Sequence, residues 1–207
     1  MSLVLYHHPY SRAAGVLWML EELGVDYELR FVDLLSGAHK APELLALNPM
    51  GKLPILTDGD QVITEVAAIG LYLADRYALG RLAPKLDDPQ RGTYLRWSLF
   101  APSVIEPGAI AKMNNWEAKA SSVGWGTHES MLDGIEFAIR DRQYLLGDSF
   151  SMADVIFGGT VRFMLRFKMI EARPAFTAYA ERLSARPAAL RADARNAAIV
   201  EERGIGR

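Results

Sequence analysis

Patterns typical of β-strands occur only in the first third of this chain, and this uneven distribution limits the folds open to it. Two short apolar segments flank a helical pattern that ends near Gly24. Such a strand–helix–strand unit builds parallel sheets. A hairpin turn at residues 58–60 then separates two further strands. The expected strands are at 2–6, 27–32, 54–56 and 62–63, with helices between Tyr10 and Gly24, at 42–47 and around 69–77.

After about residue 87 the strand signal disappears and helical patterns follow one another. Pro102 and Pro107 interrupt the first of them, so a kink or break is expected there. The stretch 78–88, with Gly80 and Pro84, is the best linker candidate. We therefore predict an α/β domain at residues 1–78 followed by an all-helical domain at 87–207. Its helices are expected at 91–114, 127–140, 151–166 and 175–185.

The chain contains no cysteine, and this limits the chemistry that it can supply. Disulfide bridges, thiolate metal sites and a cysteine nucleophile are excluded, so any thiol chemistry uses a sulfur that a ligand brings in. The net charge of −2 argues against a general nucleic-acid binder, which needs a basic face. No apolar stretch approaches the roughly 18 residues that span a membrane, and the start lacks a signal-peptide pattern. We expect a cytoplasmic protein whose partners are small molecules.

Charge is distributed unevenly along the chain. Residues 1–80 contain 5 Lys or Arg against 10 Asp or Glu, a balance of −5. An anionic ligand bound by this region would need local cationic groups to overcome the negative potential that this net charge creates. His7 and His8 are adjacent in an extended segment, where side chains alternate, so they cannot both face one metal ion. No metal site is expected.

Three segments together resemble the glutathione transferase family. They are NPMGKLP at 48–54, ITE at 63–65 and FSMADV at 150–155, where Ser151 and Asp154 are spaced as a helix capping box. The resemblance covers nearly the whole chain. It implies a thioredoxin-like domain followed by a C-terminal helical bundle, glutathione as co-substrate, no metal and a homodimer.

The resemblance also implies which residues bind glutathione. In the family the proline that matches Pro54 is cis, and the residue that matches Leu53 pairs its backbone with the cysteinyl part of the ligand. The γ-glutamyl end is expected at Glu65 and Val66, where backbone N–H groups at a helix start meet the carboxylate. Relatives usually have Ser or Thr where Val66 stands, so one hydrogen bond is missing. His39 and Lys52 are the candidates for the glycine carboxylate, with Lys40 a weaker one.

Ser11 matches the serine of theta-like and many bacterial transferases, whose hydroxyl donates to the glutathione sulfur. The alternative interpretation is that Ser11 only caps the following helix. Tyr6 is the second candidate donor, because other classes use a tyrosine near the end of the first strand. Several relatives have a basic residue where this chain has Gly15. Glycine in a helix interior costs about 1 kcal/mol relative to alanine.

The predicted activity is conjugation of glutathione to a small hydrophobic electrophile. Glutathione-dependent reduction of peroxides or disulfides requires the same thiolate and stays open, as does a binding or regulatory protein without catalysis. The electrophile is expected between the loop at 7–10 and the second domain. Candidate contacts are Phe100, Ser103, Val104, Pro107, Met113, Trp116, Phe163 and Phe167.

Overall fold

The computed structural model describes residues 3–206 and divides into two compact units. The first unit contains Met1–Leu73 together with Arg186–Arg207, and the second contains Ala74–Ala185. The predicted ranges 1–78 and 87–207 divide the chain differently at its C-terminal end, because the last helix packs on the first unit. No helix within residues 3–206 is both long and apolar enough to cross a membrane.

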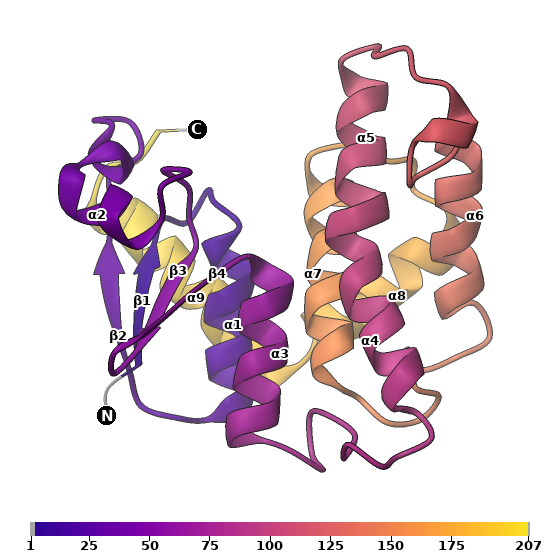
Figure 1. The fold of residues 1–207 in the computed structure, drawn as a ribbon, viewed down its shortest axis with the longest axis horizontal. Coiled ribbons are helices and arrows are strands. Elements are labelled where there is room, and N and C mark those ends of the chain that lie inside the picture. Colours follow the sequence, from indigo (N-terminus) through magenta and orange to yellow (C-terminus); the bar gives the residue numbers. More distant parts are fainter. Residues whose placement is uncertain (1–2, 207) are drawn as a thin grey trace. The chain divides into compact units, whose positions relative to one another are not determined.

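The first unit is built on a four-stranded mixed sheet with the order β2-β1-β3-β4 (Figure 1). The predicted strand–helix–strand unit is confirmed: β1 pairs in parallel with β2, and α1 connects them. The other two strands add antiparallel pairs, β1 with β3 and β3 with β4. The strands are β1 (Leu3–His7), β2 (Tyr27–Phe31), β3 (Ile55–Asp58) and β4 (Gln61–Thr64).

Helix α1 (Ala13–Leu23) buries the predicted apolar stripe, including Val16, Leu20 and Leu23. It ends at Gly24, whose left-handed conformation (φ 68°) is one that glycine adopts at little cost. The short helix α2 (Pro42–Leu47) has the predicted bounds, and Leu44 anchors it in a cluster with Val32 and Ile55. A 3₁₀ turn (η1, Ala38–Lys40) precedes α2, and α3 (Val66–Tyr77) follows β4.

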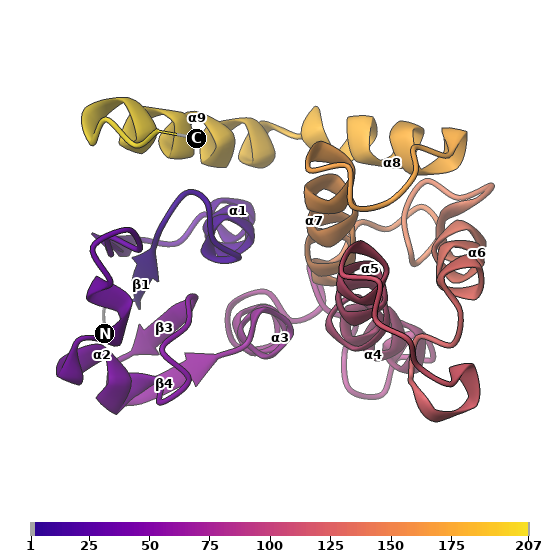
Figure 2. The same ribbon diagram turned by 90° about the horizontal axis from the view of Figure 1, so that it is seen from above.

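The sequence patterns did not predict helix α9 (Pro187–Glu202) as a separate element. It packs against α1 within the first unit (Figure 2). Small residues on its buried face, Ala188, Ala189 and Ala192, permit the close approach. Ion pairs fasten the two helices: Arg186 contacts Glu22 at 2.7 Å and Arg191 contacts Glu21 at 2.8 Å.

The second unit is all-helical, as predicted. The axes of helices α4 to α7 are roughly aligned and α8 lies across them (Figures 1 and 2). The expected break near Pro102 and Pro107 is a π-helical turn at Ala101–Ile105, because proline has no N–H to continue the α-helical hydrogen bonds. The core contains Tyr94, Trp97, Phe157 and Tyr179. The elements are α4 (Arg91–Phe100), α5 (Glu106–Met113), the 3₁₀ turn η3 (Ala120–Ser122), α6 (His128–Ile139), α7 (Met152–Arg166) and α8 (Pro174–Ser184).

Candidate active site

The topology of the sheet brings the predicted glutathione residues to one edge. Strands β1 and β2 run in parallel and end at this edge with His7 and Phe31. Strand β3 is antiparallel to β1 and begins here with Ile55, and β4 ends here with Thr64, the register partner of Ile55. The segments that join these strand ends to the rest of the unit therefore meet at the same edge. They carry Ser11, His39, Lys52, Leu53, Pro54, Glu65 and Val66.

Ser11 lies two residues before the first residue of α1 and is half-buried. Its Oγ donates to the carbonyl oxygen of His8 at 2.8 Å and accepts from the N–H of Ala13 at 3.1 Å. The hydroxyl proton can rotate to another acceptor, whereas the bond from Ala13 holds the oxygen in place. The geometry thus combines a helix-capping role with a proton donor that can be redirected.

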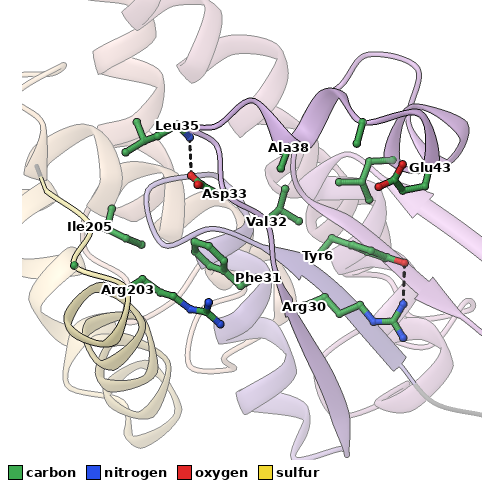
Figure 3. Close-up of a pocket in the computed structure, with 13 residues that line it drawn as sticks. Tyr6, Arg30, Phe31, Val32, Asp33, Leu35, Ala38, Glu43, Arg203 and Ile205 are labelled. Carbon is green, nitrogen blue, oxygen red and sulfur yellow. Dashed lines mark hydrogen bonds between the residues drawn. The ribbon is translucent and has the colours of Figure 1, made fainter.

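Tyr6, the second candidate donor, lies in a different environment. Its ring packs against the cluster of Val32, Leu44 and Ile55 that α2 covers, and its hydroxyl accepts from Arg30 Nη1 at 3.2 Å. It also lines a cavity of about 660 Å³ that extends from β2 to the end of α9 (Figure 3). That cavity contains none of the seven predicted glutathione residues. The surroundings of Tyr6 therefore favour Ser11 as the donor.

The segment before β3 is held in shape by Asn48, a residue to which the sequence analysis assigned no role. Asn48 is buried, and its side chain donates to the carbonyl of Lys52 at 2.9 Å and accepts from the N–H of Met50 at 3.1 Å. Asparagine bonds readily to the backbone two residues on, so the NPMG segment contained this signal. The Leu53–Pro54 peptide bond is cis, as the resemblance implies. The Lys52 side chain is exposed.

His39 lies in the 3₁₀ turn η1 and contributes a polar atom without a partner. Its Nδ1 is buried and has no hydrogen bond to any residue in the described part of the chain. A Cβ added to Gly51 would lie 3.7 Å from the His39 carbonyl oxygen, so this turn and the segment before β3 are neighbours. Because buried polar atoms are almost always paired, this nitrogen is a candidate ligand contact.

Glu65 and Val66 form the junction between β4 and α3. Glu65 has a left-handed backbone (φ 66°), which is uncommon for a residue other than glycine. Val66 is the first residue of α3, and the carbonyl of Glu65 accepts from the N–H of Ile69 at 2.9 Å. The first N–H groups of a helix have no partner within it, so this junction presents donors to an anion.

Two histidines support the loop before Ser11. His7 is fully buried, and its Nε2 lies 2.8 Å from the side-chain oxygen of Asn196 on α9. Burial lowers the pKa of His7 to about 4, so the ring is neutral near pH 7 and donates from Nε2 to this oxygen. The Nδ1 of His8 accepts from the N–H of Tyr10 at 3.1 Å, and burial lowers the pKa of His8 as well. No local sequence pattern indicates the long-range partner Asn196.

Gly15 has open space beside it, and two of the candidate electrophile contacts, Phe100 and Trp116, differ in their exposure. A Cβ at Gly15 would meet no atom within 4 Å, so no bulky neighbour requires the glycine. The ring of Phe100 packs against Trp97 and Phe157 and belongs largely to the core of the second unit. Trp116 is 62% exposed. Within residues 3–206, no group of three or more His, Cys, Asp or Glu side chains is arranged to hold a metal ion.

A four-stranded mixed sheet with helices, joined to an all-helical unit, defines the class of the protein. Comparisons identify the family. Residues 1–75 match the model of the glutathione S-transferase N-terminal domain, and residues 117–187 match that of the C-terminal domain. The chain belongs to the glutathione S-transferase family. Glutathione S-transferase 3 of Zea mays is 31% identical over 212 residues, which cover 90% of each chain.

Solved structures agree with this assignment. A glutathione transferase from Methylococcus capsulatus matches with a TM-score of 0.79 and 31% identity, covering 95% of this chain and 100% of that one. A glutathione transferase from Phanerochaete chrysosporium, solved in complex with oxidized glutathione, matches with a TM-score of 0.79 and 27% identity. It covers 96% of this chain and 97% of its own.

Proposed function

We propose that the first unit binds glutathione along the common edge of the sheet and that Ser11 donates a hydrogen bond to its sulfur. The thiolate then attacks a small hydrophobic electrophile: a carbon–sulfur bond forms, and the leaving group departs with its electron pair. The observation that carries this proposal is the pair of hydrogen bonds made by Ser11 Oγ. The bond from the Ala13 N–H holds the oxygen near the start of α1, and the hydroxyl proton can turn from the His8 carbonyl to another acceptor.

The free energy of the hydrogen bond from Ser11 to the sulfur determines how far the thiol pKa falls. A thiol with a pKa near 8.5 is only a few per cent thiolate at pH 7. To donate to sulfur, Ser11 gives up its neutral bond to the carbonyl of His8. A charge-assisted bond is worth about 1.5 to 3 kcal/mol and a neutral one about 0.5 to 1.5. The difference of about 1.4 kcal/mol lowers the thiol pKa by about one unit.

The remaining parts of glutathione have partners at the same edge. The γ-glutamyl carboxylate is proposed to accept from the N–H groups at the start of α3, with the Glu65 carboxylate on its ammonium. The backbone of Leu53, before Pro54, is proposed to pair with the cysteinyl part. The glycine carboxylate is assigned to His39 and Lys52, because His39 has a buried nitrogen without a partner and Lys52 is an exposed cation. Val66 supplies a backbone N–H but no hydroxyl.

Retention on immobilised glutathione, followed by a conjugation assay with an aryl halide, tests the function. Retention together with conjugation supports a transferase. Retention without conjugation would contradict it and would leave a glutathione-dependent reductase or a binding protein.

Ser11→Ala tests the proposed role of the hydroxyl. We expect the pKa of bound glutathione, titrated by thiolate absorbance, to rise by about one unit and turnover at pH 7 to fall about tenfold. Ser36→Ala is the matched control, because Ser36 also donates to the carbonyl three residues before it, at 3.1 Å. An unchanged thiol pKa in Ser11→Ala would remove the role from Ser11.

A homodimer in the cytoplasm is part of the proposal. Its support is the family and the reducing state of that compartment, which keeps glutathione as the thiol. Light scattering coupled to size-exclusion chromatography measures the first point, since a mass near the 22.9 kDa of one chain would contradict it.

A further inference from the structure

The second unit contains a cavity of about 580 Å³ that none of the glutathione residues lines. It lies between one face of α8 and the segment that follows α6. Its apolar lining includes Ile139, Ala175, Ala178 and Tyr179. The volume falls within the range of about 300 to 1,000 Å³ typical of small-molecule sites.

Three arginines line this cavity with little compensating charge. Arg140 has one carboxylate neighbour, Asp141, at 3.5 Å, and both side chains are largely exposed. Arg142 lies over the ring of Phe137, and Arg182 donates to the carbonyl oxygen of Gln143 at 2.9 Å. Within the described residues neither Arg142 nor Arg182 has a carboxylate partner. The lining therefore has three guanidinium groups against one carboxylate.

This surplus contrasts with two other arginines of the same unit, Arg173 and Arg91. Arg173, just before α8, pairs with four carboxylates, those of Glu129, Asp133, Glu136 and Glu171. Arg91 forms a two-bond pair with Asp75 at 2.6 and 2.7 Å. Arg173 and Arg91 are thus fully paired, whereas the cavity arginines have unused donors. An anion is the ligand that would satisfy them.

We propose that this cavity binds a small organic phosphate. The planar guanidinium fork matches the oxygen atoms of a phosphoryl group, and a doubly charged anion uses a surplus of two positive charges better than a carboxylate does. The apolar lining from α8 gives an uncharged body a surface to pack on, which free phosphate would not use. The site lies within the second unit and does not depend on the glutathione-site assignment.

Titration with 1-naphthyl phosphate, followed by its fluorescence anisotropy, tests the proposal in the full chain. We expect 1-naphthol to bind at least tenfold more weakly, because it lacks the phosphoryl group. Arg142→Glu and Arg182→Ala should each weaken binding of the phosphate at least tenfold, and added salt should weaken it further. Ala178→Trp, at an exposed position, should block the cavity without altering its charge.

Arg166→Glu is the matched control. Arg166 also lies over an aromatic ring, that of Phe167 at 5.8 Å, in the same unit but outside the cavity. The Arg166→Glu variant should bind 1-naphthyl phosphate with an affinity within twofold of that of the original chain. The proposal is overturned if the phosphate and 1-naphthol bind equally well, if Arg166→Glu weakens binding as much as Arg142→Glu, or if Ala178→Trp has no effect. Glutathione conjugation should be unchanged in the three cavity variants, and a loss there would instead indicate general damage to the fold.

Discussion

Two helix starts, one in each unit, use a polar side chain in different ways. At the start of α7, Asp154 is fully buried and accepts from the N–H groups of Leu145 and Ser151 and from the hydroxyls of Ser151 and Tyr179. Ser11 at the start of α1 is half-buried and makes one donor bond and one acceptor bond. A buried, fully bonded cap stabilises the fold, whereas a partly exposed hydroxyl can turn to donate a hydrogen bond to a ligand.

The largest expected effect is that of Asp154→Ala on stability. Three donors, the Leu145 N–H, the Ser151 N–H and the Tyr179 hydroxyl, would be left buried without a partner, at about 1 to 3 kcal/mol each. We expect a loss of about 3 kcal/mol or more in the free energy of unfolding, measured by urea denaturation. An exposed cap would cost only about 1 kcal/mol.

Asp148→Ala, at an exposed position before the same helix, is the control and should cost less than 0.5 kcal/mol. The Michaelis constant for glutathione should stay the same in Asp154→Ala. A loss below 1 kcal/mol would show that the buried carboxylate gains little from its four bonds, and the contrast with Ser11 would then fail.

Val66→Ser tests the other helix start in the first unit, that of α3. A hydroxyl at this position would add a hydrogen bond to the γ-glutamyl carboxylate, worth up to about 1.5 to 3 kcal/mol, or roughly 10- to 150-fold in affinity. Because the contact is remote from the sulfur, it should lower the Michaelis constant more than it changes turnover.

Calorimetric titration of glutathione into both proteins measures the gain. Val62→Ser, on β4, is an exposed control that should leave the affinity unchanged. Equal affinity in Val66→Ser and the original chain would mean that the carboxylate does not lie at the start of α3.

The sequence predicted the local elements well, because their signals are local. Gly24 ends α1 and Pro42 begins α2, and the cis Leu53–Pro54 bond is the one that the family resemblance implied. What it did not predict depends on contacts between distant residues. Nothing near His7 indicates that its partner is Asn196, 189 residues away, or that α9 packs on α1.

His7 makes this long-range contact measurable through pH. A histidine in the unfolded chain has a pKa near 6.5, and burial lowers the pKa of folded His7 to about 4. Between these values the unfolded state binds the proton and the folded state does not, so stability falls as the pH decreases. From pH 7 to pH 5 the expected loss from His7 is about 2 kcal/mol.

Urea denaturation at pH 7 and at pH 5 compares the original chain with His7→Gln, which retains a donor for Asn196. The variant should lose about 2 kcal/mol less than the original over this interval. Some dependence on pH will remain, because burial also lowers the pKa values of His8 and His128. If both proteins lost the same free energy of unfolding between pH 7 and pH 5, His7 would be protonated in the folded state near pH 6.

Gly15→Ala gives the smallest expected change and compares the two units directly. A Cβ at Gly15 in α1, or at Gly92 in α4, meets no atom within 4 Å, so alanine should stabilise either helix by about 0.5 to 1 kcal/mol. At Gly158 in α7 the added carbon would lie 2.1 Å from Leu183 Cδ1, and the same substitution should destabilise. Thermal denaturation of the three variants should therefore give two increases in melting temperature and one decrease.

Turnover separates stability from function, since Gly15 lies one turn after Ser11. Unchanged turnover in Gly15→Ala, with the gain in stability, would show that the glycine serves neither packing nor catalysis. A fall in turnover without loss of stability would show that the chain needs the open space beside α1.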